Sequence, residues 1–213
     1  MTYKTRFQYL FDKASDIAHA ARASSPHAVS LPPLIFVTDP ARVRHPEDIA
    51  RHLPAGCGVI YRHFGEPHAR ERAQLLRRIS HDHGLILLIG EDEALADEVG
   101  ADGVHLRELS LDRAGTVIRP GWIVTAACHS ALAMKRAEAQ RGLAAVLVSP
   151  VFASPSPSAQ GIPPLGAHGV RRLAEATSLP VIALGGITCD TIEQLRDCGL
   201  SGVAAVDAFK LED

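Results

Sequence analysis

Short apolar runs alternate with longer amphipathic stretches along most of the chain. Each run is continuous, rich in Val, Ile, Leu or Ala, and followed by polar residues or glycine. The runs number eight: LIFVT (34–38), CGVIY (57–61), LILLI (85–89), DGVHL (102–106), WIVTA (122–126), AVLVS (145–149), PVIAL (180–184) and GVAAV (202–206). Such runs are typical of strands that are buried on both faces of a parallel sheet.

Helix-like stretches separate the runs. They are PEDIARHL (46–53), HARERAQLLRRI (68–79), EDEALADEV (91–99), SALAMKRAEAQR (130–141), GAHGVRRLAEAT (166–177) and CDTIEQLRDC (189–198), with a less regular LDRAGTVI (111–118). Eight strand-then-helix units in roughly 180 residues predict an α/β fold, a (β/α)8 TIM barrel. An open, doubly wound sheet is the alternative. The first run is not followed by GxGxxG, which disfavours a dinucleotide-binding version of that sheet.

The N-terminal segment stands apart from this rhythm. Apolar side chains recur there at steps of three and four residues, which predicts a helix with one apolar face: Phe7, Leu10, Phe11, Ala14, Ile17, Ala18 and Ala21. We expect Ser24, Ser25 and Pro26 to end it. The sequence thus predicts an N-terminal helical extension over 1–30 and a barrel over 31–213. This extra helix either packs against the barrel or serves as a dimerisation surface, which makes a homodimer a candidate assembly.

Composition excludes several classes of protein. The 213 residues are 46% hydrophobic and 22% charged, values that are ordinary for one globular domain. A formal net charge of −2 provides no positive field for nucleic acid or an anionic membrane. No apolar run approaches the roughly 18 residues of a membrane-spanning helix. The four cysteines are widely spaced and form no CxxC pair, so we expect a reduced, cytoplasmic protein.

Polar residues that follow the first three runs are candidate site residues, because sites in such barrels lie at the C-terminal ends of the strands. Thr38 either caps a loop or contacts a ligand. Arg62 presents a planar guanidinium that suits an anion, unless it pairs with Glu66 on the surface. Glu91 and Asp92 either hold Mg²⁺ through carboxylate oxygens or cap the next helix.

Later strand ends add hydroxyls and imidazoles. His105 lies inside the fourth run, where a buried core role is favoured over a site role. His129 follows the fifth run and is a candidate general acid or base near neutral pH. Cys128 precedes it and is the weaker candidate, as a Cys–His nucleophile. Ser154 and Ser156 lie in the long, Pro- and Ser-rich loop after the sixth run, a lid or a disordered stretch in many compact domains.

The last two strand ends carry opposite signals for phosphate. Gly185 and Gly186 follow the seventh run, where glycine lets backbone N–H groups approach a ligand closely. Barrels often bind phosphate with the loops after strands seven and eight. Asp207 follows the eighth run and would repel phosphate, unless it points away or a cation intervenes.

These motifs together resemble the thiamin phosphate synthase/TenI family over about residues 34 to 209. The strings that carry the resemblance are FVTDP, the Arg of VIYRH, VGADGVHL, TAACHS, VSPVFASPSPS, PVIALGGIT and VAAVDAF. The resemblance implies a (β/α)8 fold and small phosphorylated thiamin precursors as partners. In the synthase branch it implies Mg²⁺-assisted joining of an aminopyrimidine pyrophosphate to a thiazole phosphate. In the TenI branch it implies a thiazole phosphate tautomerase, whose acid/base His matches His129.

Several positions depart from the synthase pattern. Beside Arg62 the family's Gln and Lys are replaced, and the Asn before Glu91 is Gly90. Asp112 stands two positions beyond the expected metal ligand, and Pro157 replaces a Lys that would grip pyrophosphate. Asp207 replaces a phosphate-binding Ser, whereas Arg107 is a candidate to compensate for lost cations. Each lost charge contact costs about 2–4 kcal/mol of transition-state stabilisation.

Three hypotheses follow. The first is a degenerate, TenI-like site that transfers a proton through His129, which needs neither Mg²⁺ nor a pyrophosphate grip. The second is an active Mg²⁺-dependent synthase that uses Glu91 as a metal ligand. The third is a non-catalytic ligand-binding or regulatory barrel. The resemblance also marks Arg62 and Ser154 as candidate catalytic residues, and it marks candidate substrate or phosphate contacts: Thr38, Arg107, Ser156, Gly185, Gly186 and Asp207.

Overall fold

Eight parallel strands close into a barrel in the computed structural model, which describes residues 1–22, 31–156 and 159–211. The strands are β1 (Leu34–Val37), β2 (Gly58–Tyr61), β3 (Ile86–Gly90), β4 (Gly103–Leu106), β5 (Ile123–Cys128), β6 (Ala145–Val148), β7 (Val181–Leu184) and β8 (Gly202–Ala205). Each of the eight predicted runs overlaps one strand, and β3 and β5 extend one and two residues beyond their runs. The ladder closes where Leu34 pairs with Val203 and Ile35 with Ala204, which excludes the open sheet. The prediction of a (β/α)8 barrel is therefore confirmed.

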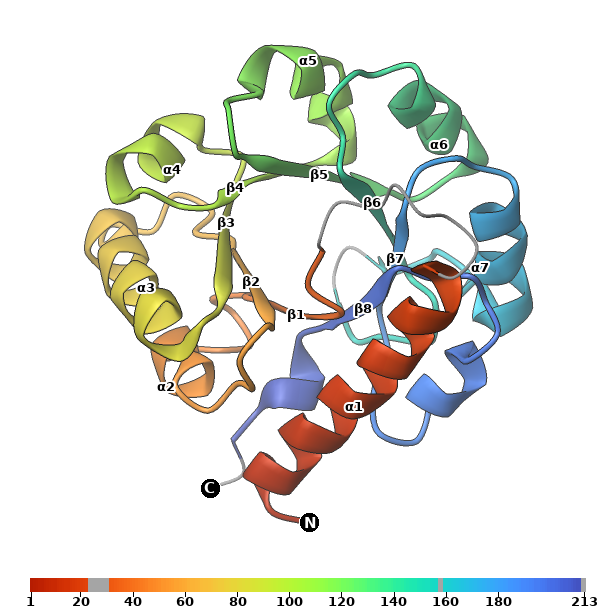
Figure 1. Cartoon of the computed structure of the whole chain (residues 1–213), viewed down its shortest axis with the longest axis horizontal. Helices are drawn as coiled ribbons and strands as arrows, with labels where there is room; N and C mark the ends of the chain where they lie inside the picture. Colours follow the sequence, from red (N-terminus) through yellow and green to blue (C-terminus); the bar gives the residue numbers. More distant parts are fainter. Residues whose placement is uncertain (23–30, 157–158, 212–213) are drawn as a thin grey trace.

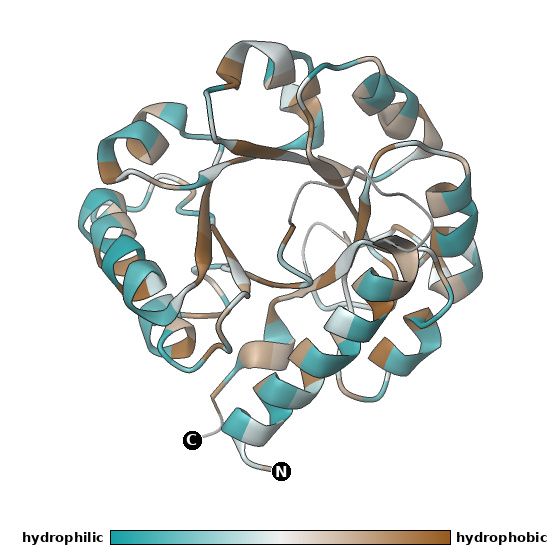
Figure 2. Cartoon of the chain, viewed as in Figure 1, coloured by the Kyte–Doolittle hydropathy of each residue, from teal (hydrophilic) through white to brown (hydrophobic). Residues whose placement is uncertain are grey.

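Helices surround the barrel as an outer layer (Figure 1). They are α1 (Tyr3–Arg22), α2 (Pro46–Ala50), α3 (Ala69–His83), α4 (Glu93–Val99), α5 (Ala114–Val117), α6 (Ala131–Glu138) and α7 (Gly166–Glu175), with 3-10 helices η1 (Glu108–Arg113), η3 (Ile192–Leu195) and η4 (Asp207–Phe209). The strands are mostly apolar, with His105 and Thr125 as polar exceptions, whereas the helices carry many hydrophilic residues (Figure 2). This distribution explains why buried strands appear as continuous apolar runs, whereas helices appear as periodic ones.

The element after β7 differs from the prediction. An α-helix is expected over 189–198, but the structure has only the four-residue 3-10 helix η3. Its apolar positions, Ile192 and Leu195, are three residues apart, and both are fully buried. A spacing of three suits a 3-10 turn as well as an α-helix, so the pattern alone does not distinguish them.

The N-terminal helix α1 covers the seam between β8 and β1. Its apolar face is buried against the barrel, with Phe7 and Leu10 fully inaccessible to solvent. Phe7 packs edge-on against Phe209, which packs against Phe36 of β1, at ring-centroid distances of 5.2 and 5.3 Å. Within the described residues, β8 is followed by η4 rather than by an α-helix. Helix α1 thus occupies the place that an eighth outer helix would fill.

Of the two interpretations of the N-terminal helix, packing against the barrel is the one that the structure shows. The residues expected to end it, Ser24, Ser25 and Pro26, lie outside the described ranges, and α1 is assigned to Arg22. None of the helices in the described part of the chain has the length and apolarity needed to cross a membrane.

Truncating the aromatic contact at the seam should strongly destabilise the fold. We expect Phe7→Ala to lower the free energy of unfolding by about 3–5 kcal/mol, because a fully buried ring is replaced by a cavity. The exposed Lys4→Ala on the same helix should change it by less than about 0.5 kcal/mol. Equilibrium unfolding in urea measures both. Equal values for the two variants would show that α1 contributes little to closure.

Candidate active site

Two cavities open at the end of the barrel where the strands terminate, each with a volume of about 560 Å³. The first cavity lies among the loops after β6, β7 and β8 and is also bordered by Arg42 and Ser149. The second cavity lies among the loops after β2, β3 and β4 and includes His105 and Arg107. Among the described residues, Arg62 alone lines both. The side chain at the end of β2 therefore forms the boundary between the two spaces.

Arg62 is fixed by the end of the neighbouring strand. Its backbone N–H donates to the Thr38 hydroxyl at 2.9 Å, and its Nε donates to the Thr38 carbonyl at 2.7 Å. Its Nη2 lies 3.5 Å from an Asp39 carboxylate oxygen but is buried without a hydrogen-bond partner. Burial lowers the pKa of Arg62 to about 10, so the guanidinium keeps its charge at neutral pH. The result is a buried cation whose charge is only partly compensated.

Thr38 thus has a positioning role in this structure. It is 1% exposed and lines neither cavity. Its hydroxyl bridges the ends of β1 and β2 rather than facing a ligand. The predicted contact of Thr38 with substrate stays a prediction. In the structure, Thr38 contacts Arg62, and Arg62 lines the cavities.

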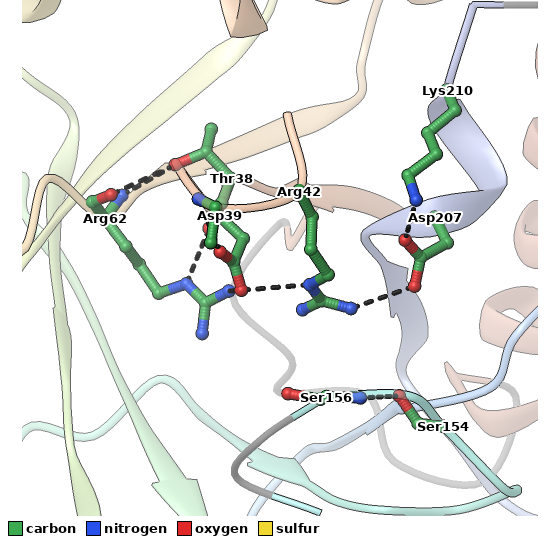
Figure 3. A network of polar contacts seen from close by, with 9 residues as sticks. Thr38, Asp39, Arg42, Arg62, Ser154, Ser156, Asp207 and Lys210 are labelled. Atoms are coloured by element: carbon green, nitrogen blue, oxygen red, sulfur yellow. Dashed lines mark hydrogen bonds and ion pairs between the residues drawn. The ribbon is translucent and has the colours of Figure 1, made fainter. Parts of the chain in front are cut away.

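A chain of ion pairs crosses the first cavity at the β8 end (Figure 3). Arg42 donates from Nε to Asp39 at 3.0 Å and from Nη1 to Asp207 at 2.9 Å. Lys210 places its ammonium 2.8 Å from the other carboxylate oxygen of Asp207. The sequence prediction allowed Asp207 in a phosphate pocket only if it pointed away or met a cation. In the structure it lines the cavity and meets two.

Arg42 and Lys210 were not predicted as site residues from the sequence. Neither follows a strand directly, and each stands three residues after an acid, as Asp39–Arg42 and Asp207–Lys210. The spacing of three residues between acid and base was the sequence feature that could have indicated these ion pairs. It did not show that Arg42 would reach across the closed seam to Asp207, which lies 165 residues further along the chain.

Gly185 and Gly186 form the β7 side of the first cavity. Both have positive φ angles, +101° and +66°. A side chain at Gly186 would meet the Ala153 carbonyl at 2.5 Å, and one at Gly185 would crowd Pro150. Glycine is therefore required here by the close approach of the β6 loop. That packing requirement is separate from the predicted role in phosphate binding.

Ser154 and Ser156 line the first cavity from the β6 loop. Arg42 and Arg62 line the same cavity, and Figure 3 shows the Ser154 hydroxyl directed to the Ser156 backbone N–H. The Ser156 backbone N–H donates to the Ser154 hydroxyl at 3.3 Å, a weak turn within the loop. Pro157, which stands where a Lys was expected, and the following Ser158 lie outside the described residues. The lining of the first cavity thus includes both serines and cations.

His129 lies at the rim rather than inside either cavity. Its Nδ1 is 3.0 Å from the Ser149 carbonyl oxygen and 3.1 Å from the Ser149 hydroxyl, and Ser149 lines the first cavity. Its backbone N–H donates to Glu108 at 2.6 Å. The adjacent Cys128 is buried, which raises the pKa of its thiol to about 12. A Cys128 thiolate is therefore excluded near neutral pH, and the Cys–His nucleophile does not fit this structure.

The second cavity contains a neutral imidazole and strained backbone. His105 is 7% exposed, and burial lowers its pKa to about 3, while its Nδ1 lies 2.9 Å from the Thr125 hydroxyl. It is buried as expected, yet it also borders the cavity. In the described residues, Phe64 and Glu91 are the non-glycine residues with positive φ, +48° and +66°, and both line this cavity. Such strain concentrates at functional sites.

The Glu91 carboxylate, which was expected to hold Mg²⁺, is hydrogen-bonded to other residues of the protein. Glu91 accepts hydrogen bonds from the backbone and guanidinium of Arg107 and from the Ser110 hydroxyl, and it lies 3.8 Å from Arg113. Asp92 caps α4 by accepting from the Leu95 N–H at 2.9 Å. The described residues include no group of three His, Cys, Asp or Glu side chains able to hold a metal ion. The residues at this position do not fit Mg²⁺, because the acid faces cations of the protein.

Arg107 consequently serves first as a partner of Glu91. Its side chain is 66% exposed, and it lines the second cavity together with Arg62. We predicted that Arg107 compensates for a cation of the synthase pattern. Pairing with Glu91 reduces that ability, since the carboxylate offsets much of the positive charge of Arg107. Direct contact of Arg107 with substrate stays a prediction.

The Glu91 pairing should make stability depend on pH. Partial burial tends to raise the pKa of Glu91, but hydrogen bonds from Arg107 and Ser110 outweigh it and hold the pKa below 4.5. A lowered folded-state pKa stabilises the protein above the unfolded pKa, and this stabilisation is lost as pH falls through the folded value. The stability difference between wild type and Glu91→Gln should be constant above pH 5 and shrink below about pH 4.5. Urea unfolding across pH 3–7 measures it.

The exposed Glu138→Gln on α6 controls for the change in net charge. A stability difference for Glu91→Gln that stays flat across this range would contradict the pairing.

Comparisons with known proteins agree with this architecture. A family model described as thiamine monophosphate synthase, TMP-TENI, matches residues 34–209. A thiamine-phosphate synthase of Methanoculleus marisnigri is 33% identical over 183 residues, 82% of this chain and 86% of that protein. A solved thiamine phosphate pyrophosphorylase from Pyrococcus furiosus superposes with a TM-score of 0.65 at 22% identity, covering 84% of this chain and 90% of that one.

A second relative is longer. The bifunctional protein ThiM/ThiE of Symbiobacterium thermophilum is 33% identical over 168 residues, which are 76% of this chain but only 35% of that protein. This chain therefore spans about a third of that relative's length. The family match begins at β1 and leaves α1 outside, while it includes all eight strands. Because the match covers the whole closed barrel, the chain belongs to the thiamine monophosphate synthase (TMP-TENI) family.

Proposed function

We propose that this chain performs TenI-like proton transfer on a small thiazole precursor of thiamin, with His129 as the acid and base. The observation that carries the proposal is the contact of His129 Nδ1 with the Ser149 carbonyl at 3.0 Å. A carbonyl oxygen only accepts hydrogen bonds, so Nδ1 bears the proton and Nε2 keeps its lone pair. This tautomer is the one that a general base requires.

The chemistry needs no metal. The Nε2 lone pair takes a proton from a ring carbon of the thiazole, and the electron pair of the broken C–H bond stays in the ring. Returning the proton to a different ring atom completes the tautomerisation. The Ser149 carbonyl stabilises the intermediate imidazolium, and Arg62 offsets negative charge that develops on the substrate. In this proposal, Ser154 and Ser156 contact the substrate from the β6 loop.

The first cavity is the proposed place for the substrate. It combines the glycines after β7 with three cations, Arg42, Arg62 and Lys210. The phosphorylated thiazole is the form that the family resemblance implies. Cytoplasmic localisation and a homodimer remain predictions.

A second candidate function is the synthase reaction, for which the relatives with that name argue. The structural feature that favours it is the pair of cavities of equal volume on either side of Arg62, one for each of two substrates. Against it stands the occupied Glu91 carboxylate, which faces Arg107 and Arg113 where a Mg²⁺ ligand would be needed.

Hydrogen exchange at the thiazole tests the first candidate. We expect wild type to incorporate deuterium from D₂O into the thiazole precursor, with and without its phosphate, and NMR would measure this exchange. His129→Asn should slow exchange by about 10²–10⁴-fold, since it removes the base. His81→Asn, an exposed imidazole on α3, is the matched control and should exchange as wild type. Exchange by His129→Asn at the wild-type rate would overturn the assignment.

Formation of thiamin phosphate, detected as thiochrome, tests the second candidate. The protein would be incubated with the aminopyrimidine pyrophosphate and the thiazole phosphate, with Mg²⁺ or with EDTA. We expect no product above the no-enzyme control in either condition. Mg²⁺-dependent turnover would establish the synthase reaction instead. Absence of both exchange and thiochrome in a folded preparation would support a binding or regulatory barrel.

A further inference from the structure

A carboxylate of the protein stands at the point of the first cavity where two cations converge. Asp207 begins η4, directly after β8, and lines the cavity. One of its oxygens lies 2.9 Å from Arg42 Nη1, and the other lies 2.8 Å from Lys210 Nζ (Figure 3). These are the distances at which the oxygens of a bound anion would lie from the same groups.

The charges at this end of the cavity are already matched. Arg42 contacts two carboxylates, Asp39 and Asp207. Lys210 contacts Asp207. A dianionic phosphate that entered here would face Asp207 at short range in a partly buried space, so it would have to displace a carboxylate that is covalently tethered in place. A neutral hydroxyl would meet no such repulsion and could donate to a carboxylate lone pair that the two cations leave free.

We propose that Asp207 is a specificity-determining residue that fills the anion position between Arg42 and Lys210 and thereby selects a ligand with a free hydroxyl over its phosphate ester. The substrate class, a thiazole, rests on the proposed function. The inference adds that the free hydroxyl of the thiazole alcohol lies at the β8 end of the cavity. Arg62, whose Nη2 lacks a hydrogen-bond partner, remains the cation for a negative group elsewhere on the ligand.

Isothermal titration with inorganic phosphate tests the anion position without any turnover. We expect Asp207→Asn to bind phosphate about 10- to 100-fold more tightly than wild type, because Arg42 and Lys210 gain a free face for charge-assisted hydrogen bonds. Asp112→Asn is the matched control. Asp112 lies on η1 and pairs with Arg136 of α6, so this variant removes an equal charge outside the cavity, and its phosphate affinity should equal that of wild type.

Two further variants keep the test decisive. Asp207→Ser repeats the loss of charge with a smaller side chain, should Asp207→Asn fold poorly. Adding Arg42→Gln to either variant should remove the gain, because the gain depends on the released guanidinium. Equal phosphate affinity in wild type and both folded Asp207 variants would overturn the proposal.

A comparison of thiazole ligands tests the selection itself. Wild type should bind the thiazole alcohol more tightly than its phosphate ester, and Asp207→Asn should reverse that order. A preference of wild type for the phosphate ester would overturn the proposal. If neither thiazole binds to either protein, the proposed function fails, whereas the inorganic phosphate titration still decides the role of Asp207.

Discussion

Closure of the sheet between β1 and β8 is the constraint on which the rest of the molecule depends. Three interactions hold this seam: the backbone ladder, the aromatic contact of Phe7 and Phe36 with Phe209, and the ion pair of Arg42 with Asp207. Each joins segments from opposite ends of the sequence. Closure also brings all the strand ends to a single rim, so residues that are distant in the sequence come to share two cavities.

The rim is organised by how completely each charge is compensated. Glu91, Asp39 and Asp207 are all carboxylates at strand ends, and each lies against arginine or lysine. Arg62 differs because desolvation lowers its pKa and one of its nitrogens has no hydrogen-bond partner. Where the family resemblance led us to expect free cations and a metal ligand, the structure has internal ion pairs at Glu91 and Asp207.

The sequence predicted the barrel well and its mouth only in part. Strands such as β3 are buried on both faces, so their composition alone identifies them. Arg62 could be predicted because it directly follows a strand. Arg42 could not, since its role depends on reaching Asp207 across a seam that exists only after closure. Thr38 and Glu91 stand where a ligand contact was expected, and the sequence did not indicate that their hydrogen-bond partners would come from neighbouring elements.

The position of α1 has a consequence for how the chain matures. The helix is synthesised before its partners on β8 and η4, and the contact of Arg6 with the Lys210 carbonyl spans 204 residues. At typical elongation rates, the apolar face of α1 waits roughly 10–40 s before its binding surface exists. During that interval it is an exposed amphipathic helix of the kind that chaperones engage or that aggregates. Synthesis of β8 and η4 is therefore also the step that allows the apolar face of α1 to be buried.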